Sequence, residues 1–261
     1  MKQTLLTALK AAGVSLLESF GQPVDFKIKE SQSSIVTKAD LKSDSLIIEI
    51  IKTKFPDHNI IAEESGYSNL HSKYTWVIDP LDGTSNFASG LPWFGVLIAL
   101  FEDNQPIMGG AYLPVQDQLF FAERNNGATK NGIPFRMGKT DNLKNSLFSF
   151  SVDYTDDNSA LNESLRIYRN IVKASRNIRS TNSLVDFLYV AEGKFGGCIN
   201  LFTRIWDISA LGLIITEAGG MMKDIKGFNI SYLFDENIIE KNFAVIAGSE
   251  RIIEEIKMNV L

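Results

Sequence analysis

The segment from Trp76 to Phe87 constrains the fold of this chain most, and it reads Trp-Val-Ile-Asp-Pro-Leu-Asp-Gly-Thr-Ser-Asn-Phe. Its first three residues form a short apolar run, which is typical of the end of a buried strand. The strand leads into a turn that contains Asp79 and Asp82, where a proline fixes its own φ and a glycine permits conformations that a Cβ would forbid. Two carboxylates on such a turn suit a hard divalent cation such as Mg²⁺.

An ordinary surface turn is the alternative interpretation of this segment. It would explain Asp79-Pro80 and Asp82-Gly83 separately, but it does not explain the apolar strand before them or the polar residues after them. Gly83 and Thr84 offer backbone N–H groups and a hydroxyl, which are groups that bind an anion. The segment therefore predicts a site for a cation and an anion at the end of one strand.

Two further acidic features lie elsewhere in the chain. Glu63 and Glu64 follow a short apolar strand at residues 60–62 and precede a glycine turn. Asp207 begins a helix predicted at residues 207–218, where it could serve only as an N-cap of the first turn. Glu217 precedes a Gly-Gly pair and could be a surface carboxylate near the end of that helix.

Composition and charge limit the class of protein. A chain of 261 residues with 44% hydrophobic and 22% charged residues can form one large domain or two closely packed lobes. A net charge of −5 argues against a nucleic-acid-binding surface. The single cysteine, Cys198, excludes an internal disulfide and is expected to be a small buried residue. His58 and His71 lack metal-ligand spacing and are expected at the surface.

The first residues predict an amphipathic helix. Leu5, Leu9, Ala12 and Leu16 recur at intervals of three to four residues, and Lys10 interrupts the apolar run that a signal peptide would need. No apolar run approaches the length of a membrane span. We therefore expect a cytoplasmic protein without a membrane contact.

The first lobe is expected at residues 1–142. Residues 26–40, rich in Lys, Ser and Gln, predict a loop, and Ser43 or Asp44 is expected to cap a helix at residues 45–55. Apolar strands at residues 94–102, 106–112 and 118–123 follow the central motif, with Asp-Asn and Asn-Gly turns between strands. This order is typical of an antiparallel meander.

The second lobe is expected at residues 143–261, after a polar boundary at residues 140–145. Strands are predicted at residues 146–152, 197–200 and 243–247, with a further extended segment at residues 175–180. Helices are predicted at residues 159–174, 183–192 and 207–218. Such alternation favours a mixed, largely parallel sheet.

The three acidic features together resemble, in order and spacing, the signature segments of the inositol monophosphatase family. That family belongs to a lithium-sensitive, Mg²⁺-dependent phosphatase superfamily with fructose-1,6-bisphosphatases and nucleotide 3′-phosphatases. The resemblance extends from about Val36 to the C-terminus. It implies a layered α/β fold, an αβαβα sandwich with an antiparallel sheet in one lobe, a mixed sheet in the other and the site between them.

The resemblance also implies two Mg²⁺ sites that share one aspartate. Glu63, Asp79 and the Leu81 carbonyl match the ligands of the first ion, and Asp79, Asp82 and Asp207 match those of the second. Li⁺ inhibition is a further property that the resemblance implies.

Other matched positions concern water and phosphate. Thr84 matches the residue that hydrogen-bonds the attacking water, with Asp40 behind it. Glu64 matches a carboxylate beside the first ion, and Lys29 matches a loop lysine near a weaker third ion. The implied substrate-binding residues are Leu81, Asp82, Gly83, Thr84, Asn182, Ser183, Asn200 and Asp207.

Two of these positions depart from the family pattern. Asn182-Ser183-Leu184 stands where the family often has Gly-Ser/Thr-Ala, and Asn200 stands where inositol phosphatases have a glutamate that holds ring hydroxyls. An amide both donates and accepts hydrogen bonds but has no charge. We therefore expect a broad phosphomonoesterase that accepts inositol monophosphate without a strong preference over sugar phosphates or bisphosphates.

Alternative functions remain open at this point. A fructose-1,6-bisphosphatase, a histidinol-phosphatase or a nucleotide 3′-phosphatase would share the same metal site. A more remote alternative is a binding protein that contacts RNA or a transcription complex, as some bacterial relatives do. The expected partners are a small phosphate monoester and a second copy of the chain, since family members are commonly homodimers.

Overall fold

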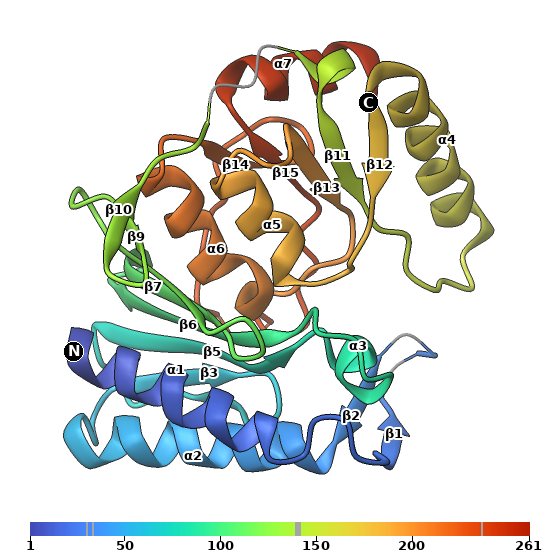
Figure 1. The fold of residues 1–261 in the computed structure, drawn as a ribbon. Coiled ribbons are helices and arrows are strands. Elements are labelled where there is room, and N and C mark those ends of the chain that lie inside the picture. The colour runs from blue at the N-terminus through green and yellow to red at the C-terminus, as the bar shows by residue number, and fades with distance from the viewer. Residues whose placement is uncertain (30, 33, 139–141, 236) are drawn as a thin grey trace.

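A computed structural model describes residues 1–29, 31–32, 34–138, 142–235 and 237–261 (Figure 1). The first part of the Trp76–Phe87 segment belongs to an inner strand of an eight-stranded sheet, and its last part begins a short helix. The strand order is β10-β9-β8-β7-β6-β5-β3-β4, and only the β3–β5 pairing is parallel. The strands are β3 (Asn59–Ala62), β4 (Gly66–Ser68), β5 (Tyr74–Asp82), β6 (Gly95–Glu102), β7 (Gln105–Leu113), β8 (Gln118–Glu123), β9 (Ala128–Lys130) and β10 (Ile133–Phe135). The predicted antiparallel meander is confirmed.

Two of the predicted hairpin turns have the backbone that their residues favour. Asp103 and Asn104, between β6 and β7, both have positive φ, as do Asn131 and Gly132 between β9 and β10. Two central residues with positive φ give a turn whose twist matches that of the flanking strands. Asn, Asp and Gly therefore indicated these turns in the sequence because they tolerate positive φ.

A five-stranded sheet forms the second half of the fold, in the order β12-β11-β13-β15-β14. Its strands are β11 (Leu147–Phe150), β12 (Asn177–Arg179), β13 (Gly197–Asn200), β14 (Met221–Asp224) and β15 (Val245–Gly248). The pairings of β11 with β12 and β13 are parallel, whereas those of β15 with β13 and β14 are antiparallel. The expected mixed sheet is confirmed, and its parallel part is the β12-β11-β13 half.

Helices cover both sheets and fill the space between them, so the αβαβα sandwich is confirmed (Figure 1). The outer face of the first sheet is covered by α1 (Lys2–Leu17) and α2 (Lys38–Lys54). Between the sheets lie α5 (Leu184–Ala191) and α6 (Ile205–Glu217). The outer face of the second sheet is covered by α4 (Asn158–Ala174) and α7 (Glu250–Asn259). Each of these interfaces contains its own cluster of buried apolar side chains.

The expected loop at residues 26–40 is wrong in part. It contains a two-stranded sheet of β1 (Phe26–Ile28) and β2 (Ile35–Thr37), and α2 begins directly afterwards. All three residues of β1 are exposed, so the strand has no apolar alternation that a sequence would reveal. Ser43 and Asp44 lie inside α2 and are not its caps.

Thr37 and Asp40 set the true start of α2. The Thr37 hydroxyl accepts a hydrogen bond from Ala39 N, and Asp40 Oδ2 accepts one from Thr37 N at 2.8 Å. This reciprocal arrangement is a capping box, which satisfies backbone donors at a helix start. A Thr-x-x-Asp spacing was present in the sequence and indicates this start.

Several further elements were not predicted from the sequence. They are strand β4, the short helix α3 (Thr84–Ala88), a 3₁₀ turn at Leu143–Asn145, strand β14 and helix α7. The expected lobe boundary between residues 142 and 143 lies beside that turn, while residues 139–141 lie outside the described residues. One buried cluster joins both sides of this boundary, for example through Val77 and Leu188. The two lobes therefore share a core.

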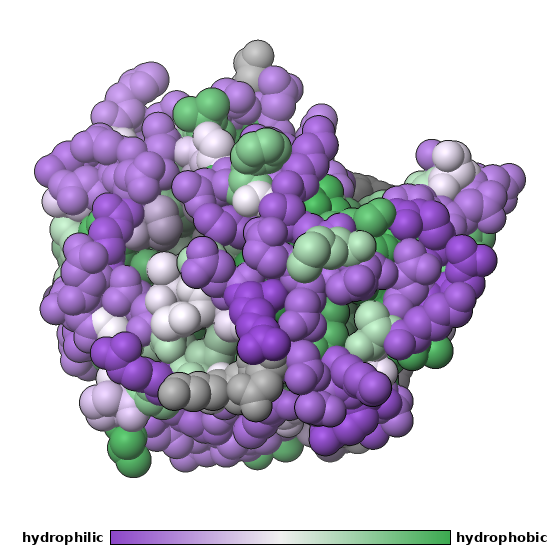
Figure 2. Space-filling model, turned by 90° about the horizontal axis from the view of Figure 1, so that it is seen from above, coloured by the Kyte–Doolittle hydropathy of each residue, from purple (hydrophilic) through white to green (hydrophobic). Residues whose placement is uncertain are grey.

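None of the described helices is long and apolar enough to cross a membrane. The face shown in Figure 2 is mostly hydrophilic, with small apolar patches between the polar side chains. Single apolar side chains on a protein surface are normal.

The prediction that His58 lies at the surface is only partly correct. Its ring is half-buried and stacks on Phe55 and Tyr74, with centroid distances of 4.8 Å to each. The fully buried Trp76 donates its indole N–H to His58 Nδ1 at 3.0 Å. Burial lowers the pKa of His58, and a protonated imidazole cannot accept this hydrogen bond. His71 is exposed, as expected.

This hydrogen bond predicts a pH-dependent contribution to stability. Because the pKa of His58 is lowered in the folded protein, the contribution is complete above the unfolded value near pH 6.5 and is lost as the pH falls. We expect His58→Phe, which keeps the stack but removes the acceptor, to cost about 1–2 kcal/mol at about pH 7.5 and less at about pH 5. Urea unfolding of both proteins measures the difference. A difference that does not change with pH would contradict the assignment.

Candidate active site

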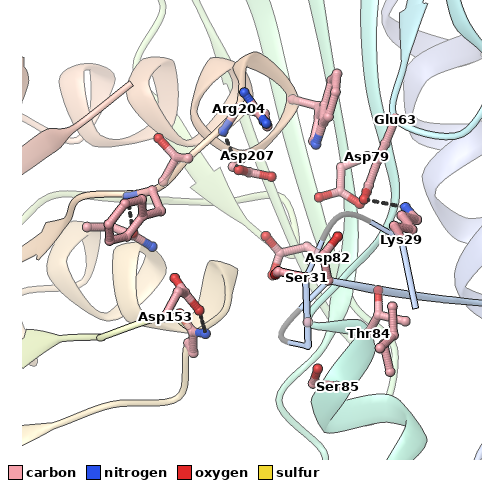
Figure 3. Close-up of a pocket in the computed structure, with 18 of the residues that line it drawn as sticks. Lys29, Ser31, Glu63, Asp79, Asp82, Thr84, Ser85, Asp153, Arg204 and Asp207 are labelled. Carbon is pink, nitrogen blue, oxygen red and sulfur yellow. Dashed lines mark hydrogen bonds and ion pairs between the residues drawn. The ribbon is translucent and has the colours of Figure 1, made fainter. Parts of the chain in front are cut away.

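Three aspartates converge where the end of β5 in the first sheet meets the start of α6. Ligand oxygen atoms of Asp79, Asp82 and Asp207 all lie within 4.8 Å of one another. Asp79 and Asp82 come from the end of β5, and Asp207 comes from the first turn of α6 (Figure 3). They lie on a pocket of about 910 Å³, and Asp79 is only 2% exposed. The structure thus brings together residues that are far apart in the sequence.

An irregularity in β5 places both of its aspartates on the same side. Residues three apart in a regular strand point to opposite faces of the sheet. Between Asp79 and Asp82 the register of β5 against β6 shifts. Such a bulge bends the strand and redirects its side chains. Pro80, which has no N–H to give to the neighbouring strand, lies within this irregular part.

Backbone N–H groups orient all three carboxylates. Leu81 N donates to Asp79 Oδ1 at 3.0 Å, Leu184 N donates to Asp82 Oδ1 at 2.6 Å, and Arg204 N donates to Asp207 Oδ2 at 2.6 Å. The last bond shows that Asp207 stabilises the start of α6 from the third helical position. Arg204, and not Asp207, is the N-cap residue. Asp207 is able to stabilise the helix start and still present its second oxygen to the site.

Burial and mutual repulsion disfavour the charged form of this cluster. Burial is the main cause that raises the pKa of Asp82 to about 7 and the pKa values of Asp79 and Asp207 well above the ordinary aspartate value. The neighbouring carboxylates raise them further. A hard divalent cation that prefers oxygen ligands, such as Mg²⁺, fits this donor set because its charge would offset the repulsion.

Glu63 lies beside the cluster and contacts a lysine. Its carboxylate follows β3 and forms an ion pair with Lys29 Nζ at 2.8 Å, and it is also hydrogen-bonded to Asp79. Lys29 contacts Glu64 as well. Burial lowers the pKa of Lys29, but the two glutamates raise it more, so its net pKa lies above the ordinary value. Glu63 therefore remains a predicted metal ligand that is adjacent to the three aspartates and not one of the converging set.

Thr84 and Asp40 form a polar pair next to the aspartates. Thr84 Oγ1 lies 3.1 Å from Asp40 Oδ1 and 3.0 Å from the Leu81 carbonyl oxygen, so its single hydrogen has two acceptors within reach. Asp40 is fully buried at the start of α2. Gly83 has a φ of +81°, and a Cβ there would approach the Trp93 carbonyl oxygen to 2.6 Å. Only glycine fits at this position.

The predicted substrate-binding residues of the second lobe lie on the same pocket. Ser183 caps α5, and its hydroxyl accepts a hydrogen bond from Val185 N. Asn182 adopts a φ of +50°, which asparagine tolerates better than most residues, so it can occupy a position where the family often has glycine. Asn200 ends β13, and its Oδ1 accepts a hydrogen bond from Phe202 N at 3.0 Å.

Four charged residues of the pocket, Asp153, Asp156, Arg204 and Glu240, were not predicted from the sequence. Asp153 follows β11, and Arg204 precedes α6; both line the pocket and are labelled in Figure 3. The position of Asp153 after a predicted strand was a usable signal, because ligands bind at the carboxyl ends of parallel strands. Arg204 lies three residues before Asp207, a spacing that only the folded helix start explains.

Two other residues have structural roles. Glu217 is half-buried, and its carboxylate accepts hydrogen bonds from Asn125 N at 2.9 Å and Gly127 N at 2.8 Å. It therefore holds the turn between β8 and β9 and is not an isolated surface carboxylate. Cys198 is buried, as expected.

Comparison with known proteins identifies the family of this chain. Residues 1–259 match the model of the Inositol monophosphatase family. The chain belongs to this family. The Nus factor SuhB of Pasteurella multocida is 32% identical over 259 residues, which are 98% of this chain and 94% of that protein. The fructose-1,6-bisphosphatase/inositol-1-monophosphatase of Aquifex aeolicus is 34% identical over 218 residues, 82% of this chain and 81% of that protein.

A solved structure confirms the fold of this family member. The crystal structure of the extragenic suppressor protein SuhB from Bartonella henselae superposes with a TM-score of 0.89 at 28% identity and covers 99% of this chain and 97% of that one. The similarity spans both lobes, so it includes every segment that contributes to the pocket.

The electrostatics of the site predict how the metal-free protein responds to pH. The pKa of Asp82 is raised to about 7 in the folded state, so the folded protein holds this proton more tightly than the unfolded chain. The resulting contribution to stability is present at low pH and is lost as the pH rises through about 7. Asp82→Asn keeps an oxygen for Leu184 N and removes the charge. In EDTA we expect this variant to melt above the wild type at about pH 8, and the difference to shrink near pH 5.

Added Mg²⁺ should reverse the order of the two melting temperatures. It stabilises the wild type by binding the folded state, and it binds the variant more weakly because one charged ligand is missing. Differential scanning fluorimetry with and without Mg²⁺ measures both effects. If the variant melted lower than the wild type in EDTA at every pH, the charge of Asp82 would not destabilise the metal-free protein, and the assignment would be wrong.

Proposed function

We propose that this protein is a Mg²⁺-dependent phosphomonoesterase that hydrolyses a small phosphorylated metabolite, either inositol monophosphate or a range of sugar phosphates. The observation that supports this most directly is the convergence of Asp79, Asp82 and Asp207 at a pocket that also contains the Thr84–Asp40 pair. Oxygen ligands for a divalent cation and a group that orients water are the two requirements of metal-assisted phosphate ester hydrolysis.

The residues that would hold Mg²⁺ are the three aspartates together with Glu63 and the Leu81 carbonyl. When bound, the ions supply Lewis-acid chemistry: they polarise the phosphoryl oxygens, lower the pKa of a water molecule and stabilise the leaving oxygen. Asp79 contacts Glu63 on one side and lies close to Asp82 and Asp207 on the other, as expected for a ligand that two ions share. Lys29, which contacts Glu63 and Glu64, adds positive charge on the same side.

Thr84 is the residue that would orient the attacking water. If its hydroxyl donates to Asp40 Oδ1, the oxygen of Thr84 is left to accept a hydrogen bond from water. Asp40 also accepts hydrogen bonds from the Thr37 backbone N–H and hydroxyl, which fix its carboxylate. Asp40 thereby directs the lone pairs of Thr84 toward the pocket and can accept a proton behind it.

A hydrolysis panel tests the proposed activity and its breadth. The purified protein with Mg²⁺ should be assayed on inositol 1-phosphate, fructose 1,6-bisphosphate, histidinol phosphate, 3′-phosphoadenosine 5′-phosphate and p-nitrophenyl phosphate. We expect hydrolysis of several monoesters and inhibition by Li⁺. Selectivity for the bisphosphate, histidinol phosphate or the nucleotide would favour the corresponding alternative enzyme.

A role in transcription is a second candidate, because several relatives have the name Nus factor. The acidic net charge of −5 disfavours direct contact with nucleic acid, and the acidic cluster and its Thr84–Asp40 pair favour catalysis. We also propose that the protein forms a homodimer, which size-exclusion chromatography with light scattering would test. Absence of phosphatase activity on every substrate of the panel would favour the transcription role.

The metal assignment predicts the effect of removing one charged ligand. Asp79→Asn keeps the shape of the side chain but loses the charge shared by both ions, so kcat/KM should fall by about 10³-fold or more, the scale of several kcal/mol. Asp57→Asn, at an exposed position away from the pocket, is the matched control and should leave kcat/KM unchanged. Near-normal turnover of Asp79→Asn in Mg²⁺ would show that the two-ion assignment is wrong.

The water-orienting role predicts a separate effect at Thr84. Thr84→Ala should lower kcat by about 10²–10⁴-fold while Mg²⁺ affinity changes little, because the hydroxyl contacts Asp40 and is proposed to orient the attacking water, and no metal ligand is removed. Thr84→Ser retains the hydroxyl and should keep most of the rate. If more Mg²⁺ restored the rate of Thr84→Ala, the threonine would belong to metal binding instead.

A further inference from the structure

The far side of the pocket is formed by the ends of two neighbouring parallel strands. β11 and β13 pair in parallel with Phe150 opposite Ile199. Asn200 is the next residue of β13, and Asp153 follows β11 by three residues, so both lie at the same edge of the sheet. Both line the pocket that contains the three aspartates, and Figure 3 shows Asp153 across this pocket from Thr84.

A hydrogen bond to one of its two carboxylate oxygens holds the Asp153 side chain in place. Asn182 Nδ2 donates to Asp153 Oδ1 at 2.8 Å. Asn182 is itself fixed, because its backbone N–H and that of Thr181 donate to the buried Asp186. Within the part of the chain that the structure describes, Asp153 Oδ2 has no hydrogen-bond partner. Burial raises the pKa of Asp153, and the hydrogen bond from Asn182 offsets only part of this effect.

Asn200 offers the opposite kind of group. Its Oδ1 accepts a hydrogen bond from Phe202 N at 3.0 Å, so the oxygen is already used within the turn. Its NH₂ group has no partner among the described residues. The amide at this position therefore acts as a donor toward the pocket, although its chemistry would allow it to accept as well.

We propose that Asp153 is a specificity-determining residue that accepts a hydrogen bond from a hydroxyl of the leaving group, so that the enzyme prefers monophosphates of polyols or sugars. This inference rests on the proposed phosphomonoesterase activity. Asp153 Oδ2 accepts from one hydroxyl, and Asn200 Nδ2 donates to an oxygen of the same group. The charged acceptor that Asn200 cannot provide is thus supplied from a different strand.

The proposal changes the expectation for bisphosphates. The sequence predicts that an amide at Asn200 eases the entry of a second phosphate. The structure places the charge of Asp153 on the same side, and Asp156 and Glu240 also line the pocket. A phosphate close to a half-buried carboxylate is disfavoured, because like charges repel more strongly where water is excluded. A leaving group with neutral hydroxyls suits this side better than one with a second phosphate.

The test uses Asp153→Asn and three substrates with Mg²⁺. The variant keeps an oxygen that can accept from Asn182 but replaces the free Oδ2 by a neutral group. The probes are inositol 1-phosphate, which has hydroxyls next to the ester, fructose 1,6-bisphosphate, which has a second phosphate, and p-nitrophenyl phosphate, which has no hydroxyl. Asp157→Asn is the matched control, since it removes a charge from the same loop, lies outside the pocket and preserves an N-cap residue for α4.

We expect Asp153→Asn to lower kcat/KM for inositol 1-phosphate by about 10-fold to 100-fold, mainly through KM, as for loss of a hydrogen bond to a charged group. Hydrolysis of p-nitrophenyl phosphate should change less than about twofold, and the bisphosphate should become the relatively better substrate. Equal losses on all three substrates, or an unchanged kcat/KM for inositol 1-phosphate, would overturn the role of Asp153. A wild type without activity on any of them would instead contradict the proposed function itself.

Discussion

Repulsion among three closely spaced carboxylates is the constraint on which the rest of this structure depends. Asp79, Asp82 and Asp207 lie within 4.8 Å of one another in a site where burial raises the pKa of each. Each is held by a backbone N–H, and the three donors come from the β5 turn, the start of α5 and the start of α6. Because these segments are distant in sequence, the whole sandwich must be assembled before the carboxylates can meet.

The packing between the sheets therefore determines the geometry of the acidic site. Val77 and Leu97 of the first sheet share a buried cluster with Leu188 of α5 and Ile214 of α6. Protein interiors are close-packed and transmit small displacements, so a shift of either helix would move Leu184 N or Asp207 relative to β5. The turn at residues 79–84 supplies two of the three converging carboxylates and α6 supplies the third, while the apolar layer sets the distances between them.

The sequence predicts those features whose signal is local. The apolar run before Asp79, the Asn-Gly turn at Asn131 and the alternation of the second lobe all predicted elements that the structure contains. β1 was missed because its side chains are exposed and it is stabilised by pairing with β2, a non-local interaction. The same limit applies to the site. The ion pair of Lys29 with Glu63 and the hydrogen bond from Asn182 to Asp153 join segments that are distant in the sequence, so no local pattern predicts them.

The roles proposed here separate phosphate chemistry and substrate choice into different parts of this fold. The groups that would hold the metal and orient water come mainly from the ends of β3 and β5 and from the starts of α2 and α6, where the sheet and the capping bonds fix them. The groups proposed to face the leaving group come from the end of β13 and from segments that follow β11 and precede α5. Segments after strands tolerate substitution without disturbing the sheet. An amide at Asn200 can therefore replace a glutamate while a carboxylate at Asp153 serves the same pocket, so a motif comparison at one position does not determine the substrate class.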